Sequence, residues 1–175
     1  MEYFQLYDIP ISFKVDGVQI KKKFYELSKK YHPDFYINEP QIKQDEILGL
    51  ATLNNKAYHV LSHPLRRIEY VLELNNLIVE GDKYQLPQSF LMEMMDINEE
   101  LMDLEFQADT SSIEQVKIQV DGIEASLFDE LFMNTKQFDE HPEGDNKDIL
   151  LKIRDIWYRQ KYLLRIRESL NKFVL

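Results

Sequence analysis

The chain turns at Tyr31-His32-Pro33-Asp34, a four-residue stretch that separates two segments with helical patterns. Proline has no N–H group and disfavours the α-helical conformation in the residue before it, so the first helix must end before Pro33. His32 and Asp34 are therefore expected at a bend and not along a buried helix face. Two polar groups held at a corner between helices suit docking against another protein.

Apolar residues at helical spacing lie on both sides of this corner. The first set is Ile20, Phe24, Leu27 and Tyr31, and the second is Ile47, Ala51, Asn54, Tyr58 and Leu61. Asp16 is placed to cap the first helix, because Gln19 follows it at the spacing of a capping box. We predict a loop over 35–43 and a second helix over 44–61, which make a helical hairpin with the first helix.

Lysine side chains occupy the other faces of the first helix. They are Lys21, Lys22, Lys23, Lys29 and Lys30. A run of lysines most often marks a solvated face. Here the lysines share a helix with the Tyr31–Asp34 corner, which favours a role in steering an acidic partner towards it.

Outside the hairpin the sequence predicts five more helical segments, and the first is a short helix over 3–7 that Pro10 ends. Ser62-His63-Pro64 interrupts the pattern, and a short helix resumes over 65–74. Periodicity is lost over 75–87, which marks the best domain boundary. Three amphipathic helices follow: one capped by Ser89 and running to 106, one striped over 113–131 and one over 148–173. Their short connections predict an antiparallel bundle.

The predicted fold is all-α, with an N-terminal domain over 1–75, a linker over 76–87 and a C-terminal three-helix domain over 88–175. A hydrophobic content of 44% supports a real core, and 5 Gly and 6 Pro in 175 residues favour helices. The absence of cysteine excludes disulfides, cysteine nucleophiles and thiolate metal sites. No apolar run is long enough for a signal peptide or a bilayer span, so we expect a soluble, cytoplasmic protein without membrane contact.

Charge is distributed unevenly along the chain, whose net charge is −10. Residues 76–146 carry 3 basic and 18 acidic side chains, whereas residues 147–175 carry 8 basic and 3 acidic ones. The last segment can therefore lie against the acidic middle of the chain. The overall negative sign argues against nucleic acid as a partner, because binding phosphates requires positive surface.

The His32-Pro33-Asp34 corner after a basic helix resembles the signature of the J-domain co-chaperones, and Ala57-Tyr58-His59-Val60-Leu61-Ser62 resembles the third helix of that family. Three further stretches resemble the HscB type, the iron–sulfur cluster assembly co-chaperones. They are Tyr3-Phe4-Gln5-Leu6, the stretch from His63-Pro64 to Leu74, and the stretch from Phe90 to Leu101. The resemblance covers almost the whole chain and is strongest over 1–104. It implies a J-domain followed by a three-helix bundle.

The resemblance implies that the first domain docks on a seventy-kilodalton heat-shock chaperone of the HscA or DnaK kind and stimulates its ATPase. His32 and Asp34 would couple docking to ATP hydrolysis, and Pro33 would set their geometry. The residues implied to assist at this surface are Lys22, Lys29, Lys30 and Tyr25. The protein itself is then expected to be no enzyme and to need no cofactor or metal.

The second domain would hold the client, the iron–sulfur scaffold IscU. The family's client surface falls here on Leu91, Met92, Met95 and Tyr162, with Asp96 and Glu99 as flanking polar contacts. Helical spacing alone favours bundle core for Leu91 and Met95. However, five of the six residues from Phe90 to Met95 are apolar, and they cannot all face one bundle interior. On the last helix, Trp157 and Tyr158 compete with Tyr162 for the aromatic position.

Some features depart from the resemblance or leave alternatives. Phe35 stands where the family often has a basic residue after His-Pro-Asp, which removes one chaperone contact. The chain lacks the cysteine-rich N-terminal extension of some relatives. A J-domain co-chaperone with a different client is one alternative. Another is an enzyme whose metal or acid–base site gathers His32, Asp34, His59, His63 and His141, although the His59–His63 pair more often sits at the surface near a helix C-terminus.

Overall fold

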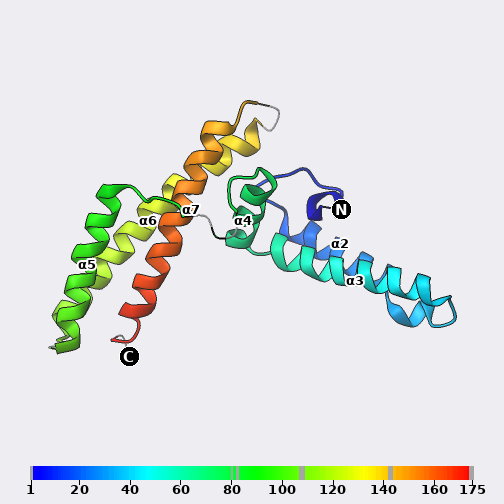
Figure 1. Ribbon diagram of the computed structural model, residues 1–175, viewed down its shortest axis with the longest axis horizontal. Coiled ribbons are helices and arrows are strands. Elements are labelled where there is room, and N and C mark those ends of the chain that lie inside the picture. The colour runs from blue at the N-terminus through cyan, green and yellow to red at the C-terminus, as the bar shows by residue number, and fades with distance from the viewer. Residues whose placement is uncertain (1, 80, 82, 107–108, 142–143, 174–175) are drawn as a thin grey trace. The chain divides into compact units, whose positions relative to one another are not determined.

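The computed structural model describes residues 2–79, 81, 83–106, 109–141 and 144–173, and helices connected by short segments make up these ranges (Figure 1). The helices are α1 (Tyr3–Leu6), α2 (Gly17–Lys30), the 3₁₀ helix η1 (Pro33–Tyr36), α3 (Gln41–Leu61), α4 (Pro64–Leu74), α5 (Gln88–Phe106), α6 (Thr110–Glu140) and α7 (Lys147–Leu170). The all-α prediction is confirmed. Within the described ranges, the helices are all too short or too polar to cross a membrane.

The chain divides into two compact units, which we describe separately. The first comprises Met1–Asn76 with Phe138–Gly144, and the second comprises Leu77–Gln137 with Asp145–Leu175. Nothing in the sequence pattern indicates that Phe138–Gly144 belongs to the first unit. The domain bounds 1–75, 76–87 and 88–175 remain predictions.

In the first unit, α2 and α3 lie side by side as the two arms of a hairpin, with η1 at its tip (Figure 1). The Asp16 carboxylate accepts hydrogen bonds from the N–H groups of Val18 and Gln19 at 2.8 and 3.4 Å, as its predicted cap position requires. Ile20 and Leu27 of α2 are buried, and Ile47, Ala57 and Leu61 of α3 are buried as well. The hairpin is therefore held by the apolar stripes that the sequence shows.

A buried asparagine connects α1, α2 and α3. The side chain of Asn54 is 1% exposed. Its Nδ2 donates to the Phe24 carbonyl oxygen at 3.1 Å and to Ser28 Oγ at 3.0 Å, and its Oδ1 accepts from the Tyr7 hydroxyl at 2.9 Å. Burial, assisted by nearby Tyr58, raises the pKa of Tyr7, so this hydroxyl keeps its proton at neutral pH. From α3, the amide binds polar groups of α2 and of the residue that follows α1, which a hydrophobic side chain cannot do.

A buried arginine fixes the segment between α1 and α2. Arg67 of α4 donates from Nε to the Phe13 carbonyl oxygen at 2.7 Å and from Nη1 to the Leu61 carbonyl oxygen. Burial lowers the pKa of Arg67, and the carboxylate of Asp139 opposes that shift. Asp139 itself accepts from the N–H groups of Phe13 and Lys14, each at 2.8 Å. The loop before α2 is thus held by hydrogen bonds on both sides.

The second unit is a three-helix bundle made of α5, α6 and α7 (Figure 1). Its buried apolar side chains come from all three helices, and they include Phe90, Met94, Ile97, Val116, Val120, Leu127, Ile153, Trp157 and Leu163. Two arginines of α7 bind carboxylates of α6: Arg159 contacts Glu130 at 2.8 Å, and Arg167 contacts Glu124 at 2.6 Å. The basic last segment therefore lies against the acidic middle of the chain, as its charge predicted.

The segment before α5 packs on α7 and is not a free tether. The hydroxyl of Tyr84 donates to Asp155 Oδ1 at 2.7 Å, and the Tyr84 ring stacks on Tyr158 with 4.3 Å between the ring centroids. Burial, together with the Asp155 hydrogen bond, raises the pKa of Tyr84 to about 12. This tyrosine anchors the start of the second unit.

Several observed helix ends differ from the sequence prediction, and the last helix ends at Leu170 and not at 173. Helix α3 begins at Gln41 and not at 44, because Pro40 supplies an extended residue directly before it. Helix α5 begins at Gln88, so Ser89 lies inside the helix and is not its cap. Helix α6 runs from Thr110 to Glu140, so it extends past both ends of the apolar stripe over 113–131, and the residues after the stripe are largely polar. Polar residues extend a helix readily once packing has fixed its start.

Replacing Asn54 with Ala should lower the free energy of unfolding by about 1–3 kcal/mol, because the buried Tyr7 hydroxyl loses its side-chain acceptor at 2.9 Å. Chemical denaturation of Asn54→Ala, Tyr7→Phe and the double variant measures this effect. We expect a coupling energy above about 0.5 kcal/mol between the two sites. Additive losses would show that the two side chains act independently.

Candidate functional site

The His32-Pro33-Asp34 corner lies at the tip of the hairpin. Pro33 is the first residue of η1, and His32 is its N-cap, with Nδ1 accepting from the N–H of Asp34 at 3.3 Å. The same ring nitrogen lies 3.7 Å from Asp34 Oδ2. The side chains of His32 and Asp34 are 53% and 80% exposed. The corner therefore presents an imidazole and a carboxylate together to an incoming partner.

Hydrogen bonds from both arms of the hairpin hold this corner in place. The Tyr36 hydroxyl donates to the Lys30 carbonyl oxygen at 3.0 Å, which fastens η1 to the end of α2. From α3, Gln44 Nε2 donates to the carbonyl oxygens of Ile37 and Glu39 at 3.2 and 2.8 Å. Of the loop predicted over 35–43, only 37–40 lie outside helices, and hydrogen bonds hold this short connection against α3.

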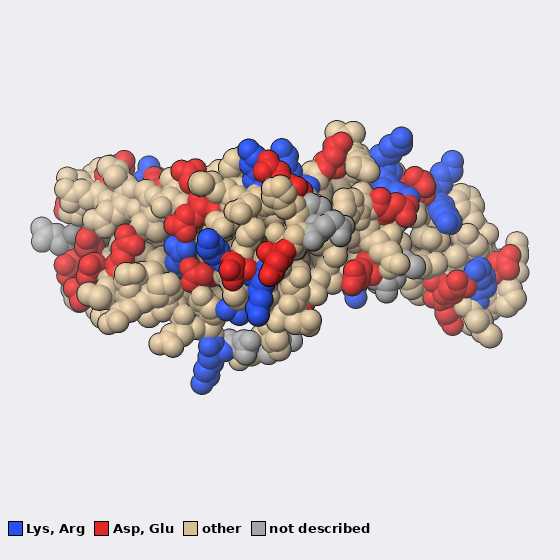
Figure 2. Space-filling view, turned by 90° about the horizontal axis from the view of Figure 1, so that it is seen from above, with Lys and Arg blue, Asp and Glu red and all other residues tan. Residues whose placement is uncertain are grey.

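The cationic residues implied by the resemblance lie on α2, which leads into the corner. Lys22, Lys29 and Lys30 are exposed, and Tyr25 beside them is 60% exposed. Lys23 differs from them because its ammonium group contacts the Asp8 carboxylate at 2.7 Å. Figure 2 shows lysine and arginine side chains projecting from this unit. Their charges can attract an acidic surface to the corner.

Large apolar side chains surround the corner, and the sequence analysis singled out only one of them. Phe35 is 67% exposed, with its ring centroid 5.7 Å from that of His32. Ile37 and Ile42 are 70% and 84% exposed. The exposure of Ile37 and Ile42 was not predicted, because the sequence pattern does not reveal which apolar side chains face solvent here. The exposed surface next to His32 is therefore apolar as well as polar.

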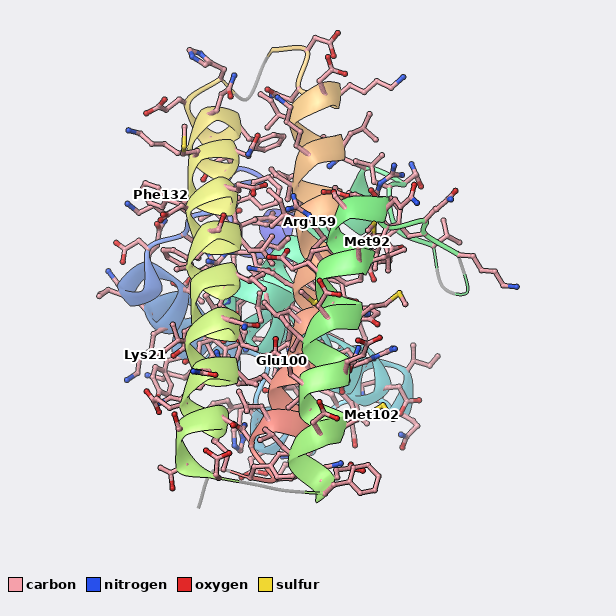
Figure 3. All side chains as sticks on the ribbon, turned by 90° about the vertical axis from the view of Figure 1, so that its left-hand side faces the viewer. Lys21, Met92, Glu100, Met102, Phe132 and Arg159 are labelled. Carbon is pink, nitrogen blue, oxygen red and sulfur yellow. The ribbon has the colours of Figure 1, made fainter. Side chains whose placement is uncertain are left out.

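The second candidate surface is the outer face of α5. Met92 and Met95 are 59% and 60% exposed, whereas Phe90 and Met94 are buried in the bundle. Leu91 lies half-buried between these two groups. The crowding of apolar residues over 90–95 thus divides between the core and the surface, and Met95 is not a core residue. Figure 3 shows Met92 on the side of α5 that faces away from α6.

Polar and aromatic candidates border this face. Asp96 and Glu99 are exposed on α5. Tyr162 of α7 is half-buried, and its ring meets the Phe90 ring edge-on at 6.1 Å. Of its competitors, Trp157 is buried and Tyr158 stacks on Tyr84. Tyr162 is therefore the aromatic residue of α7 that the structure places next to the start of α5.

A groove of about 650 Å³ separates α5 from α6. Carboxylates line it, namely Glu93, Asp96, Glu100 and Glu130. Arg159 also reaches the groove, but its charge is matched by Glu130 at 2.8 Å and by Asp155 at 2.7 Å. Glu100 and Arg159 both lie between the two helices in Figure 3. The groove is acidic, and acidic side chains also gather where α5 meets α6, at the left edge of Figure 2.

The positions of the histidines bear on the alternative of a metal or acid–base site. His59 and His63 lie at the end of α3, with ring centroids 5.4 Å apart. The guanidinium group of Arg66 contacts the His59 ring, and its positive charge disfavours binding of a metal cation there. Across the ranges that the structure describes, no three His, Asp or Glu side chains gather in a way that could hold a metal ion.

Adjacent methionines of α5 provide a test of the division between core and surface. Replacing Met94, which is 0% exposed, with Ala should lower the free energy of unfolding by about 2–5 kcal/mol through the cavity it leaves. Met95→Ala should change it by less than about 0.5 kcal/mol, because its side chain already faces solvent. Urea denaturation monitored by circular dichroism measures both, and equal losses would place Met95 in the core.

Comparison with known proteins bears on what these two surfaces serve. Residues 86–171 match the family described as the HSCB C-terminal oligomerisation domain. Over 138 residues the chain is 31% identical to a co-chaperone protein HscB homolog from Vibrio campbellii, which covers 78% of this chain and 79% of that protein.

Two solved structures of HscB proteins share the fold. The crystal structure of human co-chaperone protein HscB superimposes with a TM-score of 0.71 at 27% identity, covering 98% of this chain and 81% of that one. Chaperone HscB from Vibrio cholerae gives a TM-score of 0.61 at 27% identity, covering 97% of this chain and 99% of that one. With the exposed His-Pro-Asp corner and the helical bundle, these likenesses show that the chain belongs to the HscB family of co-chaperones.

Proposed function

We propose that this co-chaperone docks on a seventy-kilodalton heat-shock chaperone of the HscA or DnaK type, stimulates its ATPase, and delivers an IscU-type scaffold for iron–sulfur cluster assembly and transfer. Residues 1–75 would form the chaperone-docking J-domain, residues 76–87 a linker, and residues 88–175 the scaffold-binding domain. This protein would hydrolyse no ATP itself. Its work would be to bring the client to an ATP-driven machine.

The exposed corner at the tip of the hairpin carries the proposal. His32 and Asp34 are both exposed, and 3.7 Å separates His32 Nδ1 from Asp34 Oδ2, so one partner surface can contact both groups. Docking can stimulate an ATPase only if it favours one conformation of the chaperone over another. A fixed pair of polar groups suits this task, because a fixed geometry can fit one conformation of the partner and not the other.

The side chains of α2 would assist docking in a different way. Lys22, Lys29 and Lys30 are exposed, and exposed charges act mainly on the association rate and its salt dependence. Tyr25, 60% exposed among them, would add apolar contact area. Phe35, exposed next to His32, would replace the missing basic contact with an apolar one.

The outer face of α5 would hold the scaffold. Met92 and Met95 supply flexible apolar side chains that adapt to the shape of a partner. Leu91 and Tyr162 would complete the apolar centre, and Asp96 and Glu99 would form its polar border. Such a surface, apolar at its centre and charged at its edge, has the composition of a protein interface.

Replacing His32 with Gln should abolish stimulation of the chaperone ATPase while leaving scaffold affinity unchanged. Steady-state ATP hydrolysis by an HscA- or DnaK-type chaperone, measured with this protein and the scaffold separately and together, tests this expectation. Lys56→Gln is a suitable control, because Lys56 is an exposed cation of α3 outside the proposed docking residues. Loss of both stimulation and scaffold binding in His32→Gln would contradict the proposed division between the two domains.

Replacing Met92 and Met95 together with Ala should weaken binding of an IscU-type scaffold about tenfold or more, with helicity and melting temperature preserved. About 1.4 kcal/mol of lost contact energy corresponds to that factor. Isothermal titration calorimetry measures the affinity. If the unaltered protein binds no IscU-type scaffold, the client of this co-chaperone is a different protein.

A further inference from the structure

The exposed apolar surface of α5 continues well past the proposed scaffold contacts. Met102 is 61% exposed and Phe106 is 87% exposed, values that match or exceed those of Met92 and Met95. Neither residue is among the scaffold contacts that the resemblance implies. Both lie in the last five residues of α5.

These side chains form one straight line along the helix. Positions 92, 95, 99, 102 and 106 are separated alternately by three and four residues, the spacing that keeps side chains on a single face. Figure 3 shows Met92 and Met102 projecting from the same side of α5, away from α6. Glu99 is the polar member of the line. The side chains that the bundle buries, such as Met94 and Leu101, come from other positions of the helix.

The charges of α5 are all of one sign. The stretch from Gln88 to Phe106 contains six acidic residues and no lysine or arginine. Asp96, Glu99, Asp103 and Glu105 are exposed on or beside the apolar line. A partner that covers this line must therefore bring apolar side chains for its centre and cations for its borders.

We propose that the client scaffold docks along the whole length of α5, from Leu91 to Phe106, and that Met102 and Phe106 are contact residues for it. The inference rests on the function proposed above. The matching surface of the client is an elongated apolar segment, such as a helix lying alongside α5, with a lysine or arginine opposite Glu99.

Charge distinguishes this occupant from a second copy of the same chain. Two copies of α5 placed face to face would bring Asp96, Glu99 and Asp103 of one against the same carboxylates of the other. Like charges brought together at an interface oppose binding. A basic, apolar segment of another protein meets no such opposition.

The test is a double substitution, Met102→Ser with Phe106→Ser, in the full chain. Calorimetric titration with an IscU-type scaffold should show a dissociation constant raised about tenfold or more, since two exposed apolar contacts are lost. The melting temperature should be unchanged, because both side chains already face solvent. The matched control is Phe128→Ser with Met133→Ser on α6, which are 62% and 70% exposed and lie off the line, and its affinity should equal that of the unaltered protein.

A second variant tests the charge component. Glu99→Gln should weaken scaffold binding at low salt and reduce the dependence of affinity on salt concentration, because one charged contact is removed. An affinity that responds to salt exactly as before would remove the proposed cation opposite Glu99.

The outcomes distinguish a failure of this inference from a failure of the proposed function. If Met92→Ala with Met95→Ala loses the scaffold while Met102→Ser with Phe106→Ser keeps it, the extension fails and the proposed function stands. If neither double variant loses the scaffold, the client surface itself has been misplaced. Light scattering gives one further check: a dimer that dissociates in the Met102→Ser, Phe106→Ser variant would assign this line to a second copy and overturn the proposal.

Discussion

The buried amide of Asn54 is the interaction on which the N-terminal unit depends. From α3 it joins the Tyr7 hydroxyl, which follows α1, to the Phe24 carbonyl and the Ser28 hydroxyl of α2. Apolar packing alone lets one helix slide along another at small cost, whereas a buried polar group left without its partner costs about 1–3 kcal/mol. The register of α2 against α3 is set in this way, and the register determines where the loop between them must turn.

From that register follows the geometry of the corner. Pro33 ends the first arm, Tyr36 fastens the turn to Lys30, and Gln44 binds the two carbonyls on the other side. The C-terminal bundle uses different means. Its core excludes Met92 and Met95, and the ion pairs of Arg159 and Arg167 join α7 to α6. One surface is thus built from polar groups in fixed positions, and the other from flexible apolar side chains.

The sequence predicted the structure correctly where a residue type or charge pattern favours a single arrangement. The proline at 33 predicted the bend, the Asp16 cap is observed, and the charge asymmetry predicted α7 against α6. It could not predict which of the crowded residues over 90–95 face solvent, because helical spacing does not reveal where neighbouring helices lie. For the same reason the exposure of Met102 and Phe106 was not predicted. The return of Phe138–Gly144 to the first unit depends on contacts distant in sequence, such as Asp139 with Phe13.

The clamp that Gln44 places on the turn has a consequence for the thermodynamics of association. A loop that is loose in solution must lose backbone freedom when it binds, at about 1–2 kcal/mol for each residue that becomes ordered. With Ile37 and Glu39 already tied to α3, that loss of entropy is incurred during folding and not at the encounter. A partner that docked on this turn would therefore meet a smaller entropic cost of ordering, so a smaller contact area would give the same affinity.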